Sequence, residues 1–289
     1  MFRFVLGRLA PKLNGTPSVG IANISSLSLS NISNLGSRLK DLKGTQGRIS
    51  TGLRVSSPKE NSSVFAIAQQ VSGNISGMTA IKSSLNQAEA SLNTAVAAGQ
   101  AANDLVLEMK SVVIQANQPS LDDASRKALN QEFQQMSDQL NTLTSSASFN
   151  NTNLVENGAE GVDILVSQNG EKFRVEGQDL SSESLGFDNL SLETPEGAAE
   201  ALNTVNIAVD TVSSAVSELG SSVLRVEQQA EFTTSLDNVL KEGLGNLVDA
   251  DLGTETAKSA AEKVKVELGL KSLAIANAGP NAMKSLFPG

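Results

Sequence analysis

Apolar residues recur at steps of three and four along most of this chain, in long stretches that short polar breaks separate. In the first stretch, alternating steps of four and three connect Leu35, Leu39, Leu42, Ile49 and Leu53, with Gln46 in the slot between Leu42 and Ile49. This heptad spacing predicts a helix that packs one side against a partner helix. Three glycines lie in the same stretch, and each costs about 1 kcal/mol relative to alanine in a helix interior. We therefore expect this helix to need its partner for stability.

The first break occupies residues 52–63, within the stretch GLRVSSPKENSSVFAIA of residues 52–68. Helical spacing resumes at Val64 and continues to Ala116, just before a proline that cannot extend the hydrogen-bond ladder. A third helix is expected to follow, with Ser120 as its N-cap and apolar residues through Leu143. The second helix is far longer than those of most globular domains.

Residues 148–195 have a different pattern, and their VDILVSQNGEKFRVEG stretch predicts a β-hairpin around Asn169-Gly170. Helical spacing returns at Thr194, which suits an N-cap before Pro195. A last amphipathic helix is expected over residues 254–278. The predicted fold is mostly α: an elongated helical bundle or coiled coil built from both chain termini, with a small central β-hairpin region.

Composition excludes several classes of protein. The net charge is −9, with scattered basic residues, so the sequence offers no patch for nucleic acid. Histidine and cysteine are both absent, which rules out His-dependent triads, His- or Cys-ligated metals and disulfides. No apolar run approaches the ~20 residues of a membrane span. We expect no enzyme activity, no cofactor, no metal and no membrane insertion.

Four stretches resemble sequence patterns of the bacterial flagellins, the subunits of the flagellar filament. They are RISTGLRVSSPKENSSVFAIAQQV, ASFNNTNLV, NLVDADLGTETAK and LGLKSLAIANAGPNAMKSLF. They occur in the family's order, and the LVDADL wording is most similar to flagellins of alphaproteobacteria. The resemblance covers residues 18–287, nearly the whole chain.

The resemblance implies a division into domains. Residues 18–57 with 250–289 would form a terminal coiled-coil domain that lines the filament core. Residues 58–249 would form a rod-like helical domain that includes the β region at 148–195. That region is too short for the family's outer hypervariable domains, so we expect these to be absent. Residues 1–17 precede the usual family start and would be an N-terminal extension, either genuine or the result of an upstream start codon.

The break after the first helix resembles the family's spoke, a segment that meets neighbouring subunits. The inter-subunit residues expected there are Arg48, Gly52, Arg54, Pro58, Lys59 and Glu60. The glycine would relieve backbone strain, the proline would stop the helix, and the charged residues would reach adjacent subunits. The alternative is that these charges are simply solvated, since exposed ion pairs contribute little.

The C-terminal segment of the family orders on assembly and is held beforehand by an export chaperone. The matching contacts in this chain would be Leu273, Ile275, Met283, Leu286 and Phe287. The resemblance also implies export through the flagellar type III apparatus and an extracellular filament. Other implied partners are further copies of the chain, the filament cap and the hook-junction proteins.

A family segment of the form Q-R-x-R-E-L-A-V is recognised by a mammalian innate immune receptor. The aligned stretch here is LEMKSVVI, residues 107–114, in which Glu108 replaces an arginine and Ser111 replaces the glutamate, with Lys110 between them. Reversal of charge at a contact is costly. The sequence therefore predicts that this receptor does not recognise the protein.

The predicted function is a structural subunit that self-assembles into the flagellar filament for motility. A hook–filament junction protein is the first alternative, because it shares the fold. A cell-surface coiled-coil adhesin or a signalling coiled coil is the second, because heptads alone do not distinguish it. A flagellin-borne metallopeptidase would need an H-E-x-x-H motif, which a chain without histidine does not have.

Overall fold

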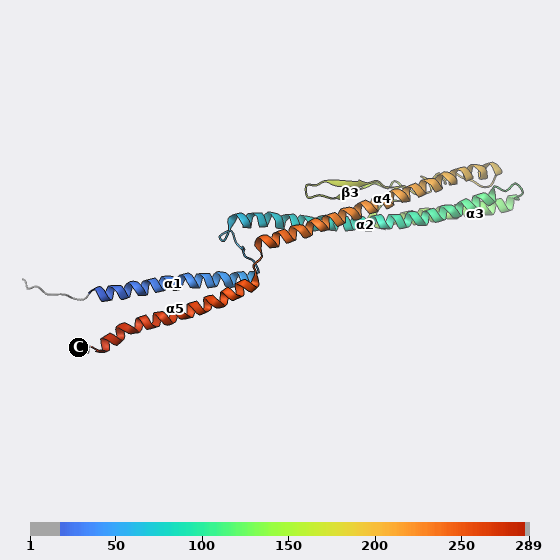
Figure 1. The fold of residues 1–289 in the computed structure, drawn as a ribbon. Helices are drawn as coiled ribbons and strands as arrows, with labels where there is room; N and C mark the ends of the chain where they lie inside the picture. The colour runs from blue at the N-terminus through green and yellow to red at the C-terminus, as the bar shows by residue number, and fades with distance from the viewer. Residues whose placement is uncertain (1–17, 287–289) are drawn as a thin grey trace, which may run out of the picture. The chain divides into compact units, whose positions relative to one another are not determined.

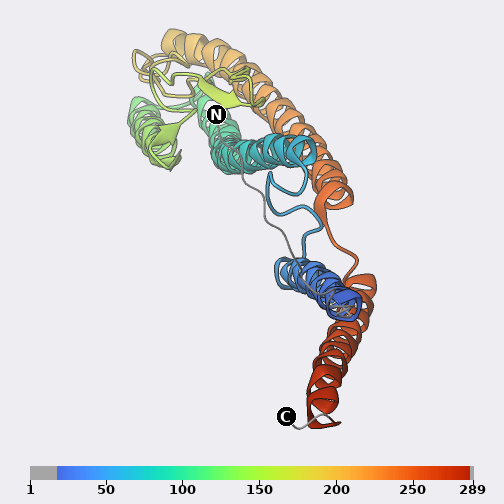
Figure 2. The same cartoon turned by 90° about the vertical axis from the view of Figure 1, so that its left-hand side faces the viewer.

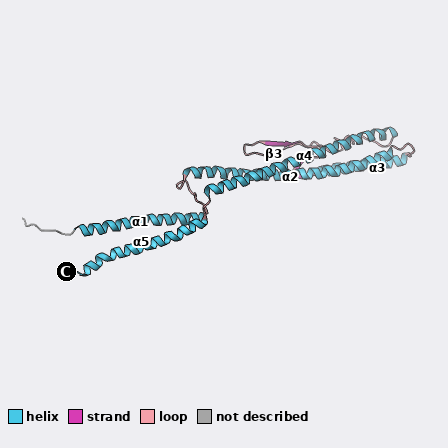
Figure 3. Ribbon diagram, viewed as in Figure 1, coloured by secondary structure: helices cyan, strands magenta, loops and turns pink. Residues whose placement is uncertain are grey.

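The computed structural model describes residues 18–286, which form five helices and two small sheets (Figures 1 and 3). The helices are α1 (Ser18–Thr51), α2 (Ser62–Ala116), α3 (Asp123–Ser146), α4 (Pro195–Val248) and α5 (Leu252–Leu286). The strands are β1 (Ser148–Phe149), β2 (Thr152–Asn153), β3 (Val162–Leu165) and β4 (Lys172–Val175). The predicted fold class is confirmed, including the absence of large outer domains between residues 148 and 195.

The chain divides into two compact units. One unit, the terminal unit, combines residues up to 68 with residues from 245 onward, and the other, the rod unit, comprises residues 69–244. The terminal unit is built on the packing of α1 against α5, which lie side by side in Figures 1 and 2. The sequence predicts domain boundaries at residues 57 and 250, and the assignment of these domains to filament layers remains a prediction.

The rod unit has one continuous apolar core shared by α2, α3, α4 and the β region. On α2 the core begins at Ile81 and continues to Ala116, and on α4 it extends from Ala198 to Val226. Phe133 of α3 meets Phe187 edge-to-face, with ring centroids 5.8 Å apart. Apart from these rings the core is mainly Leu, Ile, Val and Ala, as expected for long helices that pack along a seam.

The turn between α2 and α3 is organised by a buried arginine. Arg126 of α3 donates from Nη1 to the carbonyl of Ala116 and from Nη2 to that of Gln118, 3.3 Å away. The last carbonyls of a helix have no partner within the helix, so a cation supplied there stabilises its end. The predicted N-cap at Ser120 was wrong by two residues, because α3 begins after Asp122. The predicted cap at Thr194 is confirmed, since its hydroxyl accepts from the Gly197 N–H at 3.1 Å.

The predicted hairpin is present. Antiparallel β3 and β4 pair Val162 with Val175 and Leu165 with Lys172, and Gly170 in the turn has φ +85°. The hairpin contacts both long helices of the rod unit. Gln168 lies against Gly77 of α2 and donates to the Asn74 carbonyl at 2.6 Å, where a side chain larger than glycine would crowd it.

On the α4 side of the hairpin, the guanidinium carbon of Arg225 lies 3.8 Å from the centroid of the Phe173 ring. A cation over an aromatic face is attracted by the ring quadrupole. The Gln229 amide donates to the Val166 carbonyl at 3.4 Å. The hairpin is thus fixed to both α2 and α4 by side-chain contacts.

Candidate functional site

The candidate site is the spoke segment, residues 52–63, together with the helix pair α1–α5 of the terminal unit. The spoke segment leads from α1 into α2. Helix α1 ends where Gly52 takes φ +72°, a left-handed conformation that glycine adopts without strain. The Gly52 N–H still donates to the Arg48 carbonyl at 2.8 Å. Glycine therefore suits the backbone conformation at this position.

Beyond Gly52 the chain pairs with the end of α4. Leu53 forms an antiparallel bridge with Asp249, and the Ala250 N–H donates to the Gly52 carbonyl at 2.9 Å. The Arg54 backbone N–H donates to Val248, and its Nη2 donates to the carbonyl of Leu247 at 2.7 Å. The predicted inter-subunit residue Arg54 thus already binds the exposed end of a helix in its own chain.

Helix α5 begins with a side-chain cap. Asp251 accepts from the Thr254 N–H at 3.1 Å and from the Thr254 hydroxyl at 2.7 Å. These hydrogen bonds, with the hydroxyl first, lower the pKa of Asp251 below its ordinary value. The negative charge also lies at the positive end of the helix dipole.

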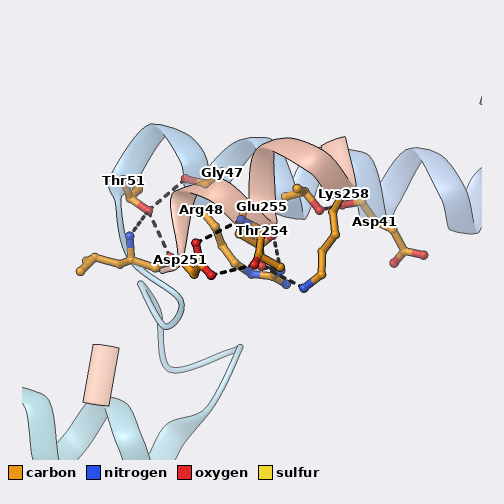
Figure 4. Close-up of polar contacts among 10 residues, drawn as sticks. Asp41, Gly47, Arg48, Thr51, Asp251, Thr254, Glu255 and Lys258 are labelled. Atoms are coloured by element: carbon orange, nitrogen blue, oxygen red, sulfur yellow. Dashed lines mark hydrogen bonds and ion pairs between the residues drawn. The ribbon is translucent and has the colours of Figure 1, made fainter. Parts of the chain in front are cut away.

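One turn further, a buried acid links the two helices. Arg48 Nη1 donates to both carboxylate oxygens of Glu255, at 3.2 and 3.1 Å, and Lys258 Nζ lies 3.3 Å from Oε1 (Figure 4). Glu255 is buried, whereas the arginine side chain is one third exposed. The contact joins the last turn of α1 to the first turns of α5. Sequence reasoning identified Arg48 but missed Asp251 and Glu255, although the Asp-x-x-Thr spacing signals a helix start.

The rest of the spoke segment is ordered by local hydrogen bonds. Glu60 Oε2 accepts from the Ser56 N–H at 2.7 Å and from the Ser57 N–H at 3.3 Å. The hydrogen bond from Ser56 holds the pKa of Glu60 below its ordinary value, and the charge of Arg48 acts in the same direction. Asn61 accepts from the Val64 N–H at 3.1 Å and so caps α2.

Pro58 and Lys59 are exposed, and no hydrogen bond or ion pair of either is observed in the described structure. Of the six predicted inter-subunit residues, Arg48, Gly52, Arg54 and Glu60 thus have contacts within the chain itself. Their contacts with other subunits remain a prediction.

The α1–α5 interface differs in register from the heptad pattern. Leu35, Leu42 and Ile49 are half-buried, but the other inward position is taken by polar Thr45, which is buried. On α5 the least exposed row is Glu255, Ser259, Glu262, Val266, Gly269 and Leu273. The two helices therefore contact through a seam that is half polar.

Several large apolar residues of the same helices remain uncovered. On α1 they are Leu29, Ile32 and Leu39, and on α5 they are Val264, Leu268, Leu270 and Ile275. Leu39 is 49% exposed, Leu268 60% and Ile275 74%. Leu29, Ile32 and Leu39 are spaced by three and seven, and Val264, Leu268 and Ile275 by four and seven, so each trio forms one row. We name these two sets the outer apolar rows.

The other predicted residues lie as follows. Leu273 is half-buried, while Met283 and Leu286 lie in the last turns of α5. Phe287 and residues 1–17 lie outside the described residues. On α2, Glu108 and Ser111 are exposed and Lys110 is half-buried, whereas the intervening Met109 and the following Val112 are buried. The changed positions of the receptor segment therefore face solvent in the isolated chain.

Within residues 18–286, no three acidic side chains approach one another closely enough to hold a metal ion. The helices described there also include none with the length and apolar character of a membrane span. The features that remain are two long chain-terminal helices that pair, uncovered apolar rows on both, and a helical rod with a small hairpin. They define an α-helical protein whose terminal helices present apolar surface to a partner.

The chain belongs to the bacterial flagellin family. Residues 22–159 match the bacterial flagellin N-terminal helical region, and residues 202–287 match the C-terminal helical region. The outer apolar rows thus lie in the two segments that define the family.

Relatives support the same assignment over nearly the full length. The chain is 33% identical to flagellin FljM of Caulobacter vibrioides, over 92% of this chain and 97% of that protein. It is 28% identical to a flagellin of Brucella melitensis, over 92% and 98% of the two chains. A solved structure from Vibrio parahaemolyticus, assigned as a flagellar hook-associated protein, has a TM-score of 0.54 at 12% identity. It covers 66% of this chain and all of its own, and it shows a shared fold only.

Proposed function

We propose that this chain is a structural subunit that self-assembles into the bacterial flagellar filament, outside the cell. The observation that carries the proposal is the pair of outer apolar rows. Apolar rows on both family-defining helices expose surface that further copies of the same helices can cover. The seam between α1 and α5 is half polar, so it does not bury the apolar residues of either helix fully.

The comparisons favour a filament subunit over a hook–filament junction protein. The relatives that match over nearly the whole chain are flagellins, whereas the hook-associated structure shares the fold at low identity. An adhesin or signalling coiled coil would be expected to cover its apolar rows within one stable helix pair.

The finer parts of the proposal concern the terminal unit and its partners. The terminal helices would line the filament core, and the spoke residues Pro58 and Lys59 would contact neighbouring subunits. An export chaperone would hold the C-terminal segment, including Leu273 and Ile275, before assembly. The filament cap and the hook-junction proteins would be met at the two ends of the polymer.

Negative-stain electron microscopy of the purified full-length protein tests this function. Filaments should form on addition of ammonium sulfate or filament seeds, both for the full chain and for a copy lacking residues 1–18 if the extension is dispensable. A Leu268→Lys variant, which changes an exposed residue, should keep its helical circular dichroism but fail to polymerise. The matched control is Thr256→Lys, which adds the same charge at an exposed position of α5 that is not aligned with Val264, Leu268 and Ile275.

Normal filaments from Leu268→Lys would show that the outer apolar rows do not carry assembly. The absence of filaments from the unmodified chain under both conditions would instead favour the junction-protein or adhesin function.

A further inference from the structure

A buried carboxylate interrupts the seam between α2 and α4 in the rod unit. Along α4, residues spaced by four and three face the core at Val226, Ala230, Thr233 and Asp237. Val226 is the last α4 residue of the apolar core, and Asp237, three turns later, is only 2% exposed. A charged group is seldom buried this deeply unless it is paired.

Asp237 has two cationic neighbours on different helices. Lys241, on the same helix, places Nζ 2.8 Å from Oδ2, and Lys82 of α2 places Nζ 3.7 Å from the same oxygen. The other oxygen, Oδ1, is buried and has no hydrogen-bond partner in the described structure. The nearby Thr233 hydroxyl is not a donor to it, because it donates to the Gln229 carbonyl of its own helix at 2.8 Å.

An unused buried acceptor is costly, since the carboxylate oxygen has lost water without gaining a donor. Lys82 can supply that donor by moving toward Oδ1, and Lys241 keeps Oδ2 when it does. The observed arrangement, with Lys241 close and Lys82 at 3.7 Å, would then be the loose one, and a hydrogen bond from Lys82 would make a tighter one.

The contact matters because no deeply buried residue follows it toward this end of the rod unit. No residue of 69–77 or 238–244 is buried, and Met78 is the last α2 residue that packs against the core. Phe232 and Val239, on either side of Asp237 along α4, are 61% and 64% exposed. The first turns of α2 and the last turns of α4 in the rod unit thus carry only half-buried apolar residues, such as Ile75 and Leu240, and Asp237 is the last deeply buried α4 position of their seam.

We propose that Asp237 and Lys82 form an ionic lock that sets how tightly residues 69–82 of α2 and 233–244 of α4 pair. Buried polar groups in a helical seam can specify register while adding little stability, and Asp237 occupies such a position. If the chain assembles as proposed above, the lock gives identical subunits two local arrangements of the rod. That assembly role rests on the proposed function, whereas the lock is a property of the single chain.

Hydrogen–deuterium exchange on the unassembled full-length protein separates the lock from simple stabilisation of α4. Exchange would be followed in peptides covering 69–80 and 238–244, with 95–113 as an internal reference. Lys82→Met, which removes the contact between helices, should speed exchange in both test peptides by about tenfold. Lys241→Met, which removes the contact within α4, should change it by no more than about twofold, because Lys82 remains to pair with Asp237.

The expected order of the two effects is opposite to the order of the two distances, since Lys241 lies closer to Asp237 than Lys82 does. The comparison therefore distinguishes a lock between helices from simple stabilisation of α4. If Asp237 served only to stabilise α4, loss of the closer Lys241 would have the larger effect, and that result would overturn the proposal. Asp237→Leu provides a second readout, because it continues the apolar core and lets both partly exposed lysines reach water. It should slow exchange in both peptides, and faster exchange in this variant would also contradict the lock. None of these measurements requires polymerisation, so a failure of the proposed function would not change their outcome.

Discussion

Arg48 at the end of α1 donates to both carboxylate oxygens of Glu255 near the start of α5, across 207 positions of sequence. Arg48→Ala should loosen this end of the helix pair by about 1–2 kcal/mol, since the acid is buried while the arginine is partly exposed. Faster amide exchange in peptides spanning 45–53 and 252–260 would measure the loss.

The matched control for that variant is Lys258→Ala, which removes a contact of Glu255 within one helix. Such a pair is worth a few tenths of a kcal/mol, about 0.2–0.5 kcal/mol. Equal effects of the two variants would show that Arg48 does not couple α1 to α5.

Gly47 inside α1 and Gly52 just after it should respond in opposite directions to replacement by alanine. Gly52→Ala forces a side chain into a left-handed backbone, which should cost about 1–2 kcal/mol. Gly47→Ala lies inside the helix, and no atom lies within 4 Å of the added methyl group, so it should stabilise α1 by about 1 kcal/mol. Thermal unfolding of the two variants, followed by circular dichroism, would give the signs, and stabilisation by Gly52→Ala would contradict the role assigned to that turn.

Removal of the buried Arg126 should destabilise the rod unit. Arg126→Ala leaves the Ala116 and Gln118 carbonyls without their donor, at a cost of about 2–3 kcal/mol in the free energy of unfolding. Arg126→Lys should recover only part of this, because an ammonium group lacks the planar fork that reaches two carbonyls. Urea unfolding would measure both, with exposed Lys127→Ala as the control that should change little.

The side-chain cap of α5 should be lost when acid protonates the Asp251 carboxylate. The folded-state pKa of Asp251 is depressed, so the stabilisation it confers is complete above the ordinary pKa of 3.8 and is lost as pH falls through the lower folded value. The chemical shift of the Thr254 amide, followed by nuclear magnetic resonance, should therefore titrate with a midpoint below 3.8. A midpoint at or above that value would mean that the cap does not form in solution, and Asp251→Asn should abolish the transition.

The receptor prediction concerns an exposed face of α2. Purified protein at nanomolar dose should fail to activate reporter cells that carry the flagellin-sensing immune receptor, because Glu108 and Ser111 depart from the recognised pattern. The double variant Glu108→Arg with Ser111→Glu should restore part of the response. Strong activation by the unmodified protein would refute this reading of the segment.

Periodicity was enough to predict the helices, the break after α1 and the hairpin at Asn169-Gly170, since each depends on local spacing and turn chemistry. It did not predict which side of α1 faces α5. The heptad row includes Leu39, but this residue faces outward, and buried Thr45 lies in the seam instead. When the apolar stripe of a helix is wider than one partner helix can cover, the sequence does not indicate which part of the stripe that partner contacts.

Long-range polar contacts also could not be predicted from the sequence. Arg54 binds the end of α4 within its own chain, and nothing local to residue 54 signals a carbonyl 193 positions away; its predicted contact with another subunit remains a prediction. The burial of Asp237 could not be predicted either, because a single acid in a helix is usually solvated. Its burial depends on where α2 meets α4.

The contact between Arg48 and Glu255 also imposes an order on how the terminal helices come together. Once these two residues and the Leu53–Asp249 bridge have formed, each further turn of α1 can meet α5 without closing another long loop. We therefore expect pairing to proceed from the spoke segment outward toward residues 29 and 275. The turns that would pair last carry the most exposed apolar residues, so they would stay available to another protein until the final step.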